Sequence, residues 1–284
     1  MDSTLPTLIS VTDLATIAAQ PDLVILDCRY QLDDPDAGTR AFEDSHIPGA
    51  IYASLHRDLS GLPSRFGGRH PLPTPQQFEA FARAAGISAN TRVVVYDDQR
   101  LAFAARAWWL FRYFGHKQVA VLDGGLGAWR DAGLAMVTGE GTPPAAARDF
   151  VASPRADMTV DYRDIHPEPM PGMQLVDARE PRRFDGEEEP IDPLAGHIPG
   201  AVNKPWKRIT DEQGFVRDRT ELEQHWADLP SDQRLVCYCG SGVTACVNLL
   251  SLYLAGRENT VLYPGSWSDW CAHILHPGSE EKSG

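Results

Sequence analysis

The sequence predicts an α/β protein built from two similar domains, each with a mostly parallel sheet flanked by helices. Three observations predict this architecture. The chain repeats its own landmarks, each half alternates short apolar runs with helical patterns, and 284 residues with 43% hydrophobic content are enough for two cores.

The internal repeat is the clearest of these observations. Four landmarks recur in the same order in the two halves of the chain. The matching pairs are 23–29 with 174–180, 45–54 with 196–205, 91–98 with 233–240, and 119–129 with 260–270. The offset between the copies shortens after the second pair, so the first half carries an extra loop, residues 55–73, which is rich in Gly, Pro and Arg.

The repeat also predicts the domain boundaries. Residues 1–140 form the predicted N-terminal domain, and residues 158–284 form the predicted C-terminal domain. We assign residues 141–157 to a linker, because this part of the chain holds turn-forming residues and no apolar periodicity.

Local signals place the main strands and helices. The apolar runs that end at Tyr96 and Tyr238 predict buried strands. Thr74 and Thr220 are the expected N-caps of two helices. The apolar segment 104–115 predicts a core-facing helix whose aromatic side chains serve packing.

Composition and charge restrict the function. A formal net charge of −13 repels phosphate backbones and anionic membranes, which argues against nucleic acid and membrane partners. We find no secretion signal and no long apolar span, and five cysteines, an odd number, indicate free thiols. We therefore expect a cytoplasmic protein.

Polar residues that occur in both copies predict scaffold roles. Three such pairs occupy matching positions. They are Asp27 with Asp177, Arg29 with Arg179, and His46 with His197. Because an unpaired buried charge is costly, we expect these side chains to form buried and mutually bonded networks.

One difference between the copies points to chemistry. Asp97 of the first copy aligns with Cys239 of the second, at the end of a predicted strand. The loop that follows consists of Gly240, Ser241, Gly242, Val243 and Thr244. An apolar helix comes next, so the thiol lies at a helix N-terminus, whose unpaired N–H groups stabilise negative charge. We expect Cys239 to be a nucleophile at neutral pH.

The residues alone leave other interpretations of Cys239. One is a small buried hydrophobe. Another is a zinc site with Cys237 and Cys246, although no second Cys pair or His-x-x-His motif accompanies them. A third is a cysteine phosphatase, but position 245 holds alanine where that chemistry needs an arginine.

The chain resembles the tandem-domain rhodanese family over nearly its whole length. The resemblance rests on two HIPGA segments, on AWWLFRYFG followed by VLDGGLGAW, on GSWSDW at 265–270, and on the loop after Cys239. The loop is most similar to that of the 3-mercaptopyruvate sulfurtransferases. Rhodaneses that use thiosulfate typically have Arg-Lys where this chain has Gly240 and Ser241.

The resemblance implies two rhodanese-like domains, of which only the second carries the nucleophile. Cys239 would attack the sulfur of 3-mercaptopyruvate, release pyruvate and hold the sulfur as a persulfide among the loop N–H groups. Thioredoxin or a low-molecular thiol would then accept the sulfur. The resemblance implies neither a metal nor an organic cofactor.

The resemblance also assigns a proton-handling group. His70, from the extra loop of the first domain, matches a histidine that lies beside the loop serine, here Ser241. The pair would stabilise or protonate the pyruvate enolate. Asp58 is the residue expected to orient His70.

Binding of the substrate carboxylate falls to arginines. Arg183 matches the position of one substrate-binding arginine, and Arg182 is the alternative to it. A second arginine, expected a little downstream, is replaced by Ile191. Arg183 would then act alone or with help from Arg65 or Arg69 of the extra loop, and binding would be looser or the preferred donor different.

Two other functions stay open at this point. A thiosulfate sulfurtransferase would use the same nucleophile, but Gly240 and Ser241 offer a dianion little beyond backbone N–H groups. A tandem module without enzymatic activity would accept sulfur on Cys239 from another protein. Formation of the persulfide from small donors would distinguish an enzyme from such a relay.

Overall fold

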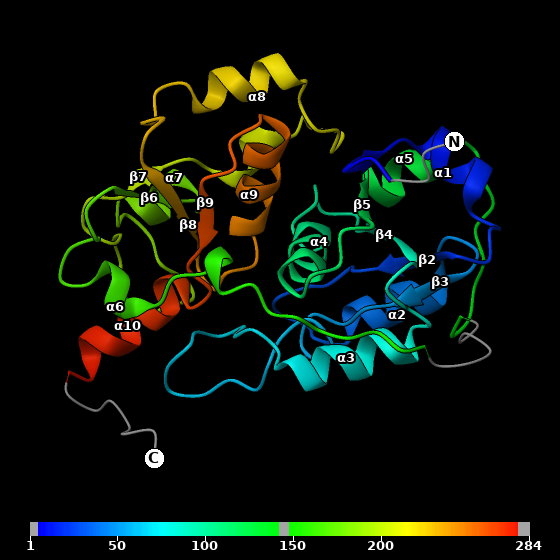
Figure 1. Cartoon of the computed structure of the whole chain (residues 1–284), viewed down its shortest axis with the longest axis horizontal. Helices are drawn as coiled ribbons and strands as arrows, with labels where there is room; N and C mark the ends of the chain where they lie inside the picture. Colours follow the sequence, from blue (N-terminus) through cyan, green and yellow to red (C-terminus); the bar gives the residue numbers. More distant parts are fainter. Residues whose placement is uncertain (1–4, 142–147, 278–284) are drawn as a thin grey trace.

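The computed structural model describes residues 5–141 and 148–277. They form two α/β units that lie side by side, the first coloured blue to green and the second green to red in Figure 1. Within these ranges no helix has the length and apolarity needed to cross a lipid bilayer.

The first unit contains a parallel sheet with the strand order β1-β5-β4-β2-β3. The strands are β1 (Leu8–Ile9), β2 (Leu23–Asp27), β3 (Ala50–Tyr52), β4 (Arg92–Tyr96) and β5 (Val119–Leu122). The central strand β4 is a run of buried valines that ends at Tyr96, which confirms the predicted strand.

Helices flank this sheet. They are α1 (Val11–Ile17), α2 (Ala37–Asp44), α3 (Pro75–Ala84), α4 (Ala104–Tyr113) and α5 (Gly125–Asp131). Thr74 caps α3 as predicted, since its hydroxyl accepts the N–H of Gln77 at 3.2 Å and the Gln77 side chain accepts the N–H of Thr74. Helix α4 is buried along most of its length, which confirms a core-facing helix.

The second unit repeats this plan with the strand order β7-β6-β8-β9, also parallel. Its strands are β6 (Met173–Asp177), β7 (Val202–Asn203), β8 (Arg234–Tyr238) and β9 (Thr260–Leu262). Its helices are α6 (Tyr162–Ile165), α7 (Pro181–Phe184), α8 (Arg219–Trp226), α9 (Ala245–Leu254) and α10 (Ser266–Leu275), with 3-10 turns η1 (Ala156–Met158) and η2 (Trp206–Ile209). Asp218 caps α8, so the predicted cap Thr220 is wrong; the Asp218 carboxylate accepts the N–H of Glu221 and starts the helix earlier.

The polar pairs shared by the two copies form matching buried networks. The ion pairs are Arg29 with Asp27 at 2.7 Å and Arg179 with Asp177 at 2.6 Å. The prediction is confirmed for these residues and for the buried His46. It is wrong for His197, which is exposed at the surface with its ring stacked on Phe184.

Helices α4 and α9 meet at the centre of the molecule (Figure 1). Their buried apolar side chains belong to one hydrophobic cluster that runs from the first unit into the second. The rings of Trp108 and Tyr253 lie 5.7 Å apart across this boundary. A shared core of this kind holds the two units in one relative position.

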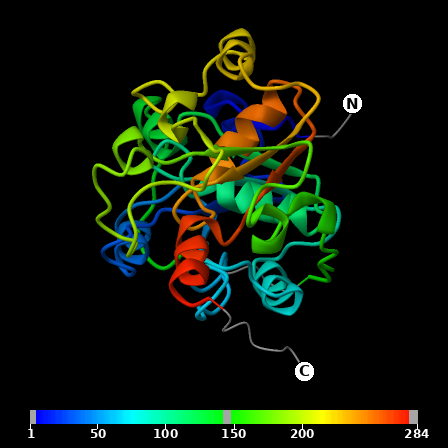
Figure 2. The same cartoon turned by 90° about the vertical axis from the view of Figure 1, so that its left-hand side faces the viewer.

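The extra loop 55–73 leaves the first unit and lies against the second. It is the cyan loop to the right of α10 in Figure 1, and Figure 2 shows α10, in red, beside the same loop. The bonds that hold it are Gly67 N–H to Asp269 Oδ1 at 2.6 Å and Arg69 N–H to Ser268 Oγ at 3.0 Å. The loop therefore delivers first-unit residues to the carboxyl edge of the second sheet.

The boundaries at residues 140 and 158 stay a prediction. Part of the predicted linker, residues 142–147, lies outside the described residues. The segment from 148 onward follows the first unit, where the N–H of Ser153 donates to the carbonyl of Phe114 at 3.0 Å.

Candidate active site

Cys239 is the first residue after β8, at the carboxyl end of the second sheet. Ligand sites of parallel sheets form at this edge, because each strand there passes into a loop. The side chain is buried, and the backbone is held on both sides. Its N–H donates to Ser266 Oγ at 3.1 Å, and its carbonyl accepts the N–H of Trp267 at 3.0 Å.

Ser266 holds Cys239 from a strained position. Its φ of 56° lies in the left-handed region that residues with a Cβ avoid, and the matching residue of the first unit is Gly125, with φ 57°. The serine hydroxyl compensates by the bond to Cys239 and by donating to the carbonyl of Tyr263 at 2.9 Å. The sequence analysis did not identify Ser266. The signal that could have found it is the repeat, in which Ser266 matches Gly125 of the first unit.

The loop 240–244 turns between Cys239 and α9. Gly242 has φ 75°, and a Cβ there would lie 2.4 Å from the carbonyl oxygen of Pro264, so only glycine fits. Among the described residues, no hydrogen-bond acceptor pairs with the backbone N–H groups of residues 240–244. Those donors are left for an anion at the Cys239 sulfur.

The first unit shows what a loop of this kind binds. Asp97 occupies the position of Cys239, and its carboxylate accepts four backbone N–H groups of the loop that follows. The donors are Gln99 at 2.9 Å, Leu101 at 3.1 Å, Phe103 at 2.9 Å and Ala104 at 2.9 Å. The repeated loop is thus a nest for negative charge, which Asp97 fills with its own carboxylate.

His70 reaches the nucleophile loop from the other unit. Its Nδ1 lies 2.8 Å from Oγ of Ser241, and only 3% of the residue is exposed. His70 is therefore buried against the nucleophile loop. Burial lowers the pKa of His70 to about 3, and the nearby Arg106, His56 and Arg69 add to the effect. The ring is therefore neutral at neutral pH, and with the hydroxyl of Ser241 it can pass a proton.

Asp58 does not orient His70. Its carboxylate accepts the N–H of Ser54 at 2.8 Å and the guanidinium of Arg57 at 2.8 Å. Within the described part of the chain, no hydrogen bond or ion pair joins it to His70. The predicted role is wrong for this geometry, because Asp58 closes the turn that begins at Ser54. The ring of this loop that lies nearest to His70 is that of His56, with 5.2 Å between the two ring centres.

Two guanidinium groups flank the start of the loop. A Cβ on Gly240 would lie 3.6 Å from both Nη atoms of Arg183 and 3.0 Å from Nη2 of Arg69. Arg183 is thus beside the nucleophile, and Arg69, from the first unit, is the second arginine there. Ile191 is 47% exposed.

Arg182 and Arg65 take no part in this cluster. Arg182 pairs at the surface with Glu187 at 3.4 Å and Glu188 at 3.1 Å. Arg65 is exposed. The structure therefore does not bring the alternative ligand Arg182 to the loop.

Two carboxylates already occupy the arginines beside the loop. Arg183 pairs with Glu189 at 2.6 Å and with Asp192 at 3.3 Å, and Arg69 also pairs with Asp192. Burial raises the pKa of Asp192 against the opposing effect of the two arginines. A substrate carboxylate must compete with Asp192, so the charge of this residue influences which donors bind.

Arg106 of α4 joins the two halves of the site, and sequence reasoning missed it. It is fully buried and donates to the carbonyls of Gly242 at 3.1 Å, His70 at 3.2 Å and Leu59 at 3.4 Å. Burial lowers its pKa, and no carboxylate in the described residues pairs with it. Since an unpaired buried cation is costly, its presence indicates a role at the site. The only sequence signal was that Arg106 is one of two arginines inside an apolar segment.

The remaining thiols are free and lie in the packed interior. Cys28, Cys237, Cys246 and Cys271 are all buried. Burial raises the pKa of each, that of Cys246 to about 12 and that of Cys271 to about 11. In the described ranges, no group of three His, Cys, Asp or Glu side chains is placed to hold a metal ion.

The chain is similar over most of its length to proteins named as sulfurtransferases. The chain is 46% identical over 278 residues to a probable 3-mercaptopyruvate sulfurtransferase of Pseudomonas aeruginosa, covering 95% of this chain and 96% of that protein. It is 39% identical over 278 residues to a Mycobacterium tuberculosis protein provisionally named a thiosulfate sulfurtransferase, covering 95% of each. The structure of a 3-mercaptopyruvate sulfurtransferase from Leishmania major matches with a TM-score of 0.84 at 31% identity, covering 95% of this chain and 75% of that one.

The repeat also has a direct counterpart among known families. Residues 10–132 and 166–273 each match the rhodanese-like domain, which agrees with the predicted tandem architecture. Together, the matched ranges, the two parallel sheets and the whole-length relatives show that this chain belongs to the rhodanese-like domain family.

Proposed function

We propose that this chain is a 3-mercaptopyruvate sulfurtransferase that carries the transferred sulfur as a persulfide on Cys239. The observation that carries the proposal is the 2.8 Å contact between His70 of the first unit and Ser241 of the nucleophile loop. Ser241 follows Cys239 by two residues, and this closeness supports a role of the pair in proton transfer. Most of the named relatives above point to the same donor.

The proposed reaction moves one sulfur atom and one proton. The Cys239 thiolate attacks the donor sulfur, an S–S bond forms, and the C–S bond breaks with its electron pair going to the carbon of the pyruvate enolate. The proton released from the donor thiol passes through Ser241 and His70 to that carbon and gives pyruvate. The negative persulfide remains among the N–H groups of 240–244, as the Asp97 carboxylate does in the first unit.

The arginines determine how the donor is held. In this proposal the donor carboxylate exchanges with Asp192 for a paired contact with Arg183, and Arg69 assists from the first unit. Thiosulfate carries a second negative charge and no carboxylate, so the nearby Glu189 and Asp192 disfavour it. A thiol, either thioredoxin or a low-molecular compound of the cytoplasm, then takes the sulfur from Cys239.

The test is steady-state release of pyruvate and sulfide from 3-mercaptopyruvate with a dithiol acceptor, run beside thiosulfate. Cys239→Ser is the blank. We expect mercaptopyruvate to be preferred, the blank to be silent, and Cys239 to gain the mass of one sulfur atom without acceptor. A preference for thiosulfate would overturn the donor assignment, and a lack of turnover with both would favour a relay module.

A further inference from the structure

A cavity of about 540 Å³ lies between the two units, far from Cys239 along the sheets. Its walls include Val119, Arg234 and Thr260, the first residues of β5, β8 and β9. Cys239 instead follows the last residue of β8. Because the strands of each sheet are parallel, the cavity lies at the amino edge and the active site at the carboxyl edge. The cavity is therefore a separate site.

The side chains that line this cavity carry an excess of positive charge. The cations are Arg112, Lys117, Arg155, Arg234 and Arg257. The carboxylates are Asp157 and Glu258. Five positive groups thus face two negative ones in a chain whose formal net charge is −13. A local reversal of sign in a concave site attracts anions.

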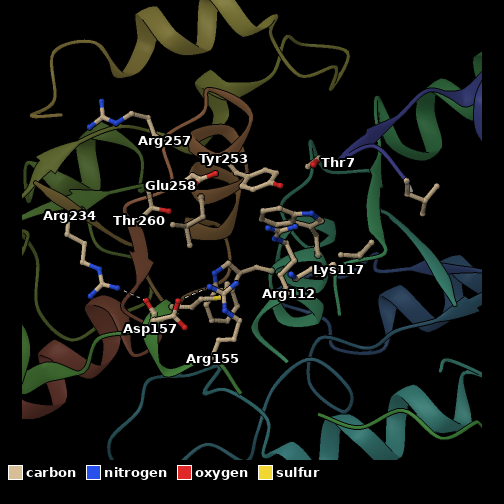
Figure 3. A pocket seen from close by; sticks show the side chains of 16 residues that line it. Thr7, Arg112, Lys117, Arg155, Asp157, Arg234, Tyr253, Arg257, Glu258 and Thr260 are labelled. Atoms are coloured by element: carbon tan, nitrogen blue, oxygen red, sulfur yellow. Dashed lines mark hydrogen bonds and ion pairs between the residues drawn. The ribbon is translucent and has the colours of Figure 1, made fainter. Parts of the chain in front are cut away.

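Among the described residues, four of these five cations have no carboxylate partner. Arg257 donates to the carbonyls of Trp226 at 3.4 Å and Pro230 at 2.5 Å. Arg155 pairs with Asp157 at 2.7 Å. Arg234 reaches only the carbonyl of Asp157, at 2.6 Å, and its Nε is buried without an acceptor. Lys117 makes no hydrogen bond or ion pair with any described residue. Figure 3 shows Arg234 and Arg257 on one side of the cavity and Lys117 with Arg112 on the other.

Arg112 packs against aromatic rings of both units. Its guanidinium carbon lies 4.3 Å from the ring centre of Tyr253 on α9 and 5.2 Å from that of Trp108 on α4. This packing restricts the guanidinium and leaves its N–H edges for paired bonds to an oxyanion. Trp108 is 2% exposed, whereas Tyr253 is 37% exposed, so Tyr253 presents the accessible ring of the pair.

We propose that this cavity is a second ligand site, which binds a phosphate-bearing small molecule of the size and charge of a nucleoside polyphosphate. Its volume lies within the roughly 300–1,000 Å³ of small-molecule sites. Guanidinium groups match phosphate oxygens, and the exposed ring of Tyr253 can stack on a planar base. The lining cations come from both units, so the ligand bridges them.

Equilibrium binding tests the proposal apart from the sulfur chemistry. The full chain with Cys239→Ser is titrated calorimetrically with ATP, tripolyphosphate and adenosine at one ionic strength set with NaCl. We expect saturable binding of ATP and tripolyphosphate, weaker by about tenfold in Arg112→Gln and in Lys117→Gln. Arg40→Gln, an exposed cation of α2 outside the cavity, is the control and should bind as the parent does.

Each outcome decides the proposal. Absence of saturable binding by the parent overturns it, as does undiminished binding by both cavity variants. An equal loss of affinity in Arg40→Gln would show that the anions are attracted to the cations of the protein in general, and would also overturn the proposal. Tighter binding of ATP than of tripolyphosphate supports stacking of the base on an aromatic ring, and equal affinity refutes that stacking. Lys117 is exposed and unpaired, so its variant tests the site without risk to folding.

Discussion

Replacement of Arg106 by methionine tests what holds the two halves of the active site together. Methionine keeps an unbranched apolar stem on α4 and removes the guanidinium. The bonds to the carbonyls of Gly242 and His70 are lost, so the nucleophile loop and the loop that carries His70 lose their common partner. The reacting groups Cys239 and Ser241 are themselves unchanged.

The expected effect on rate exceeds the effect on stability. A hydrogen bond from a charged donor contributes about 1.5–3 kcal/mol, so loss of the 3.1 Å bond to Gly242 predicts a fall of about 10- to 150-fold in kcat/KM. The free energy of unfolding should change less, because the substitution also removes an unpaired cation from a fully buried position.

The assay has two parts: kcat and KM for 3-mercaptopyruvate, and unfolding by denaturant. Arg106→Lys keeps a positive charge at this position but should not restore the full rate, because lysine lacks the guanidinium fork that reaches the carbonyls of Gly242 and His70 together.

Arg112→Met is the matched control, since Arg112 is a cation of the same helix that faces aromatic rings away from the loop. It should leave the kinetics unchanged. Wild-type kcat/KM in Arg106→Met would refute the reasoning. So would a fall in the free energy of unfolding as large as the loss of transition-state stabilisation, because a packing defect alone would explain it.

Three further predictions follow from the charges at the site. Asp192→Asn should raise the ratio of kcat/KM for thiosulfate to that for mercaptopyruvate, since the lost negative charge repels the doubly charged thiosulfate more than the singly charged mercaptopyruvate; an unchanged ratio contradicts this. His70→Asn should flatten the pH dependence of stability between pH 6 and 4. The pKa of His70 is about 3 in the folded protein, so between pH 6 and 4 only the unfolded chain binds this proton. The free energy of unfolding therefore falls by about 1.4 kcal/mol for each pH unit of acidification. A variant whose stability depends on pH as steeply as that of the parent contradicts the assignment. Asp97→Asn should lower the free energy of unfolding by about 1–3 kcal/mol, measured in denaturant, with kcat preserved, because its oxygens accept four N–H groups far from the chemistry.

Much of this protein follows from its sequence alone. The repeat identifies two α/β units, and the exchange of Asp97 for Cys239 identifies the nucleophile. Repetition, apolar periodicity and a strand-loop-helix succession are local properties, and a single sequence displays them directly. The same reasoning found α4 but assigned its side chains to packing, because nothing local distinguishes Arg106 from a charge at the helix surface.

Only the tertiary structure decided which groups meet at Cys239. Asp58 and His70 share one loop, yet Asp58 closes a turn with Ser54 while His70 crosses to Ser241 in the other unit. Asp192 lies between arginines from both units, an arrangement that no spacing along the chain indicates. These contacts depend on how α4 and α9 pack and on where the extra loop docks. The sequence by itself determines the elements and the reactive atom, and the packing of the two units determines the partners of that atom.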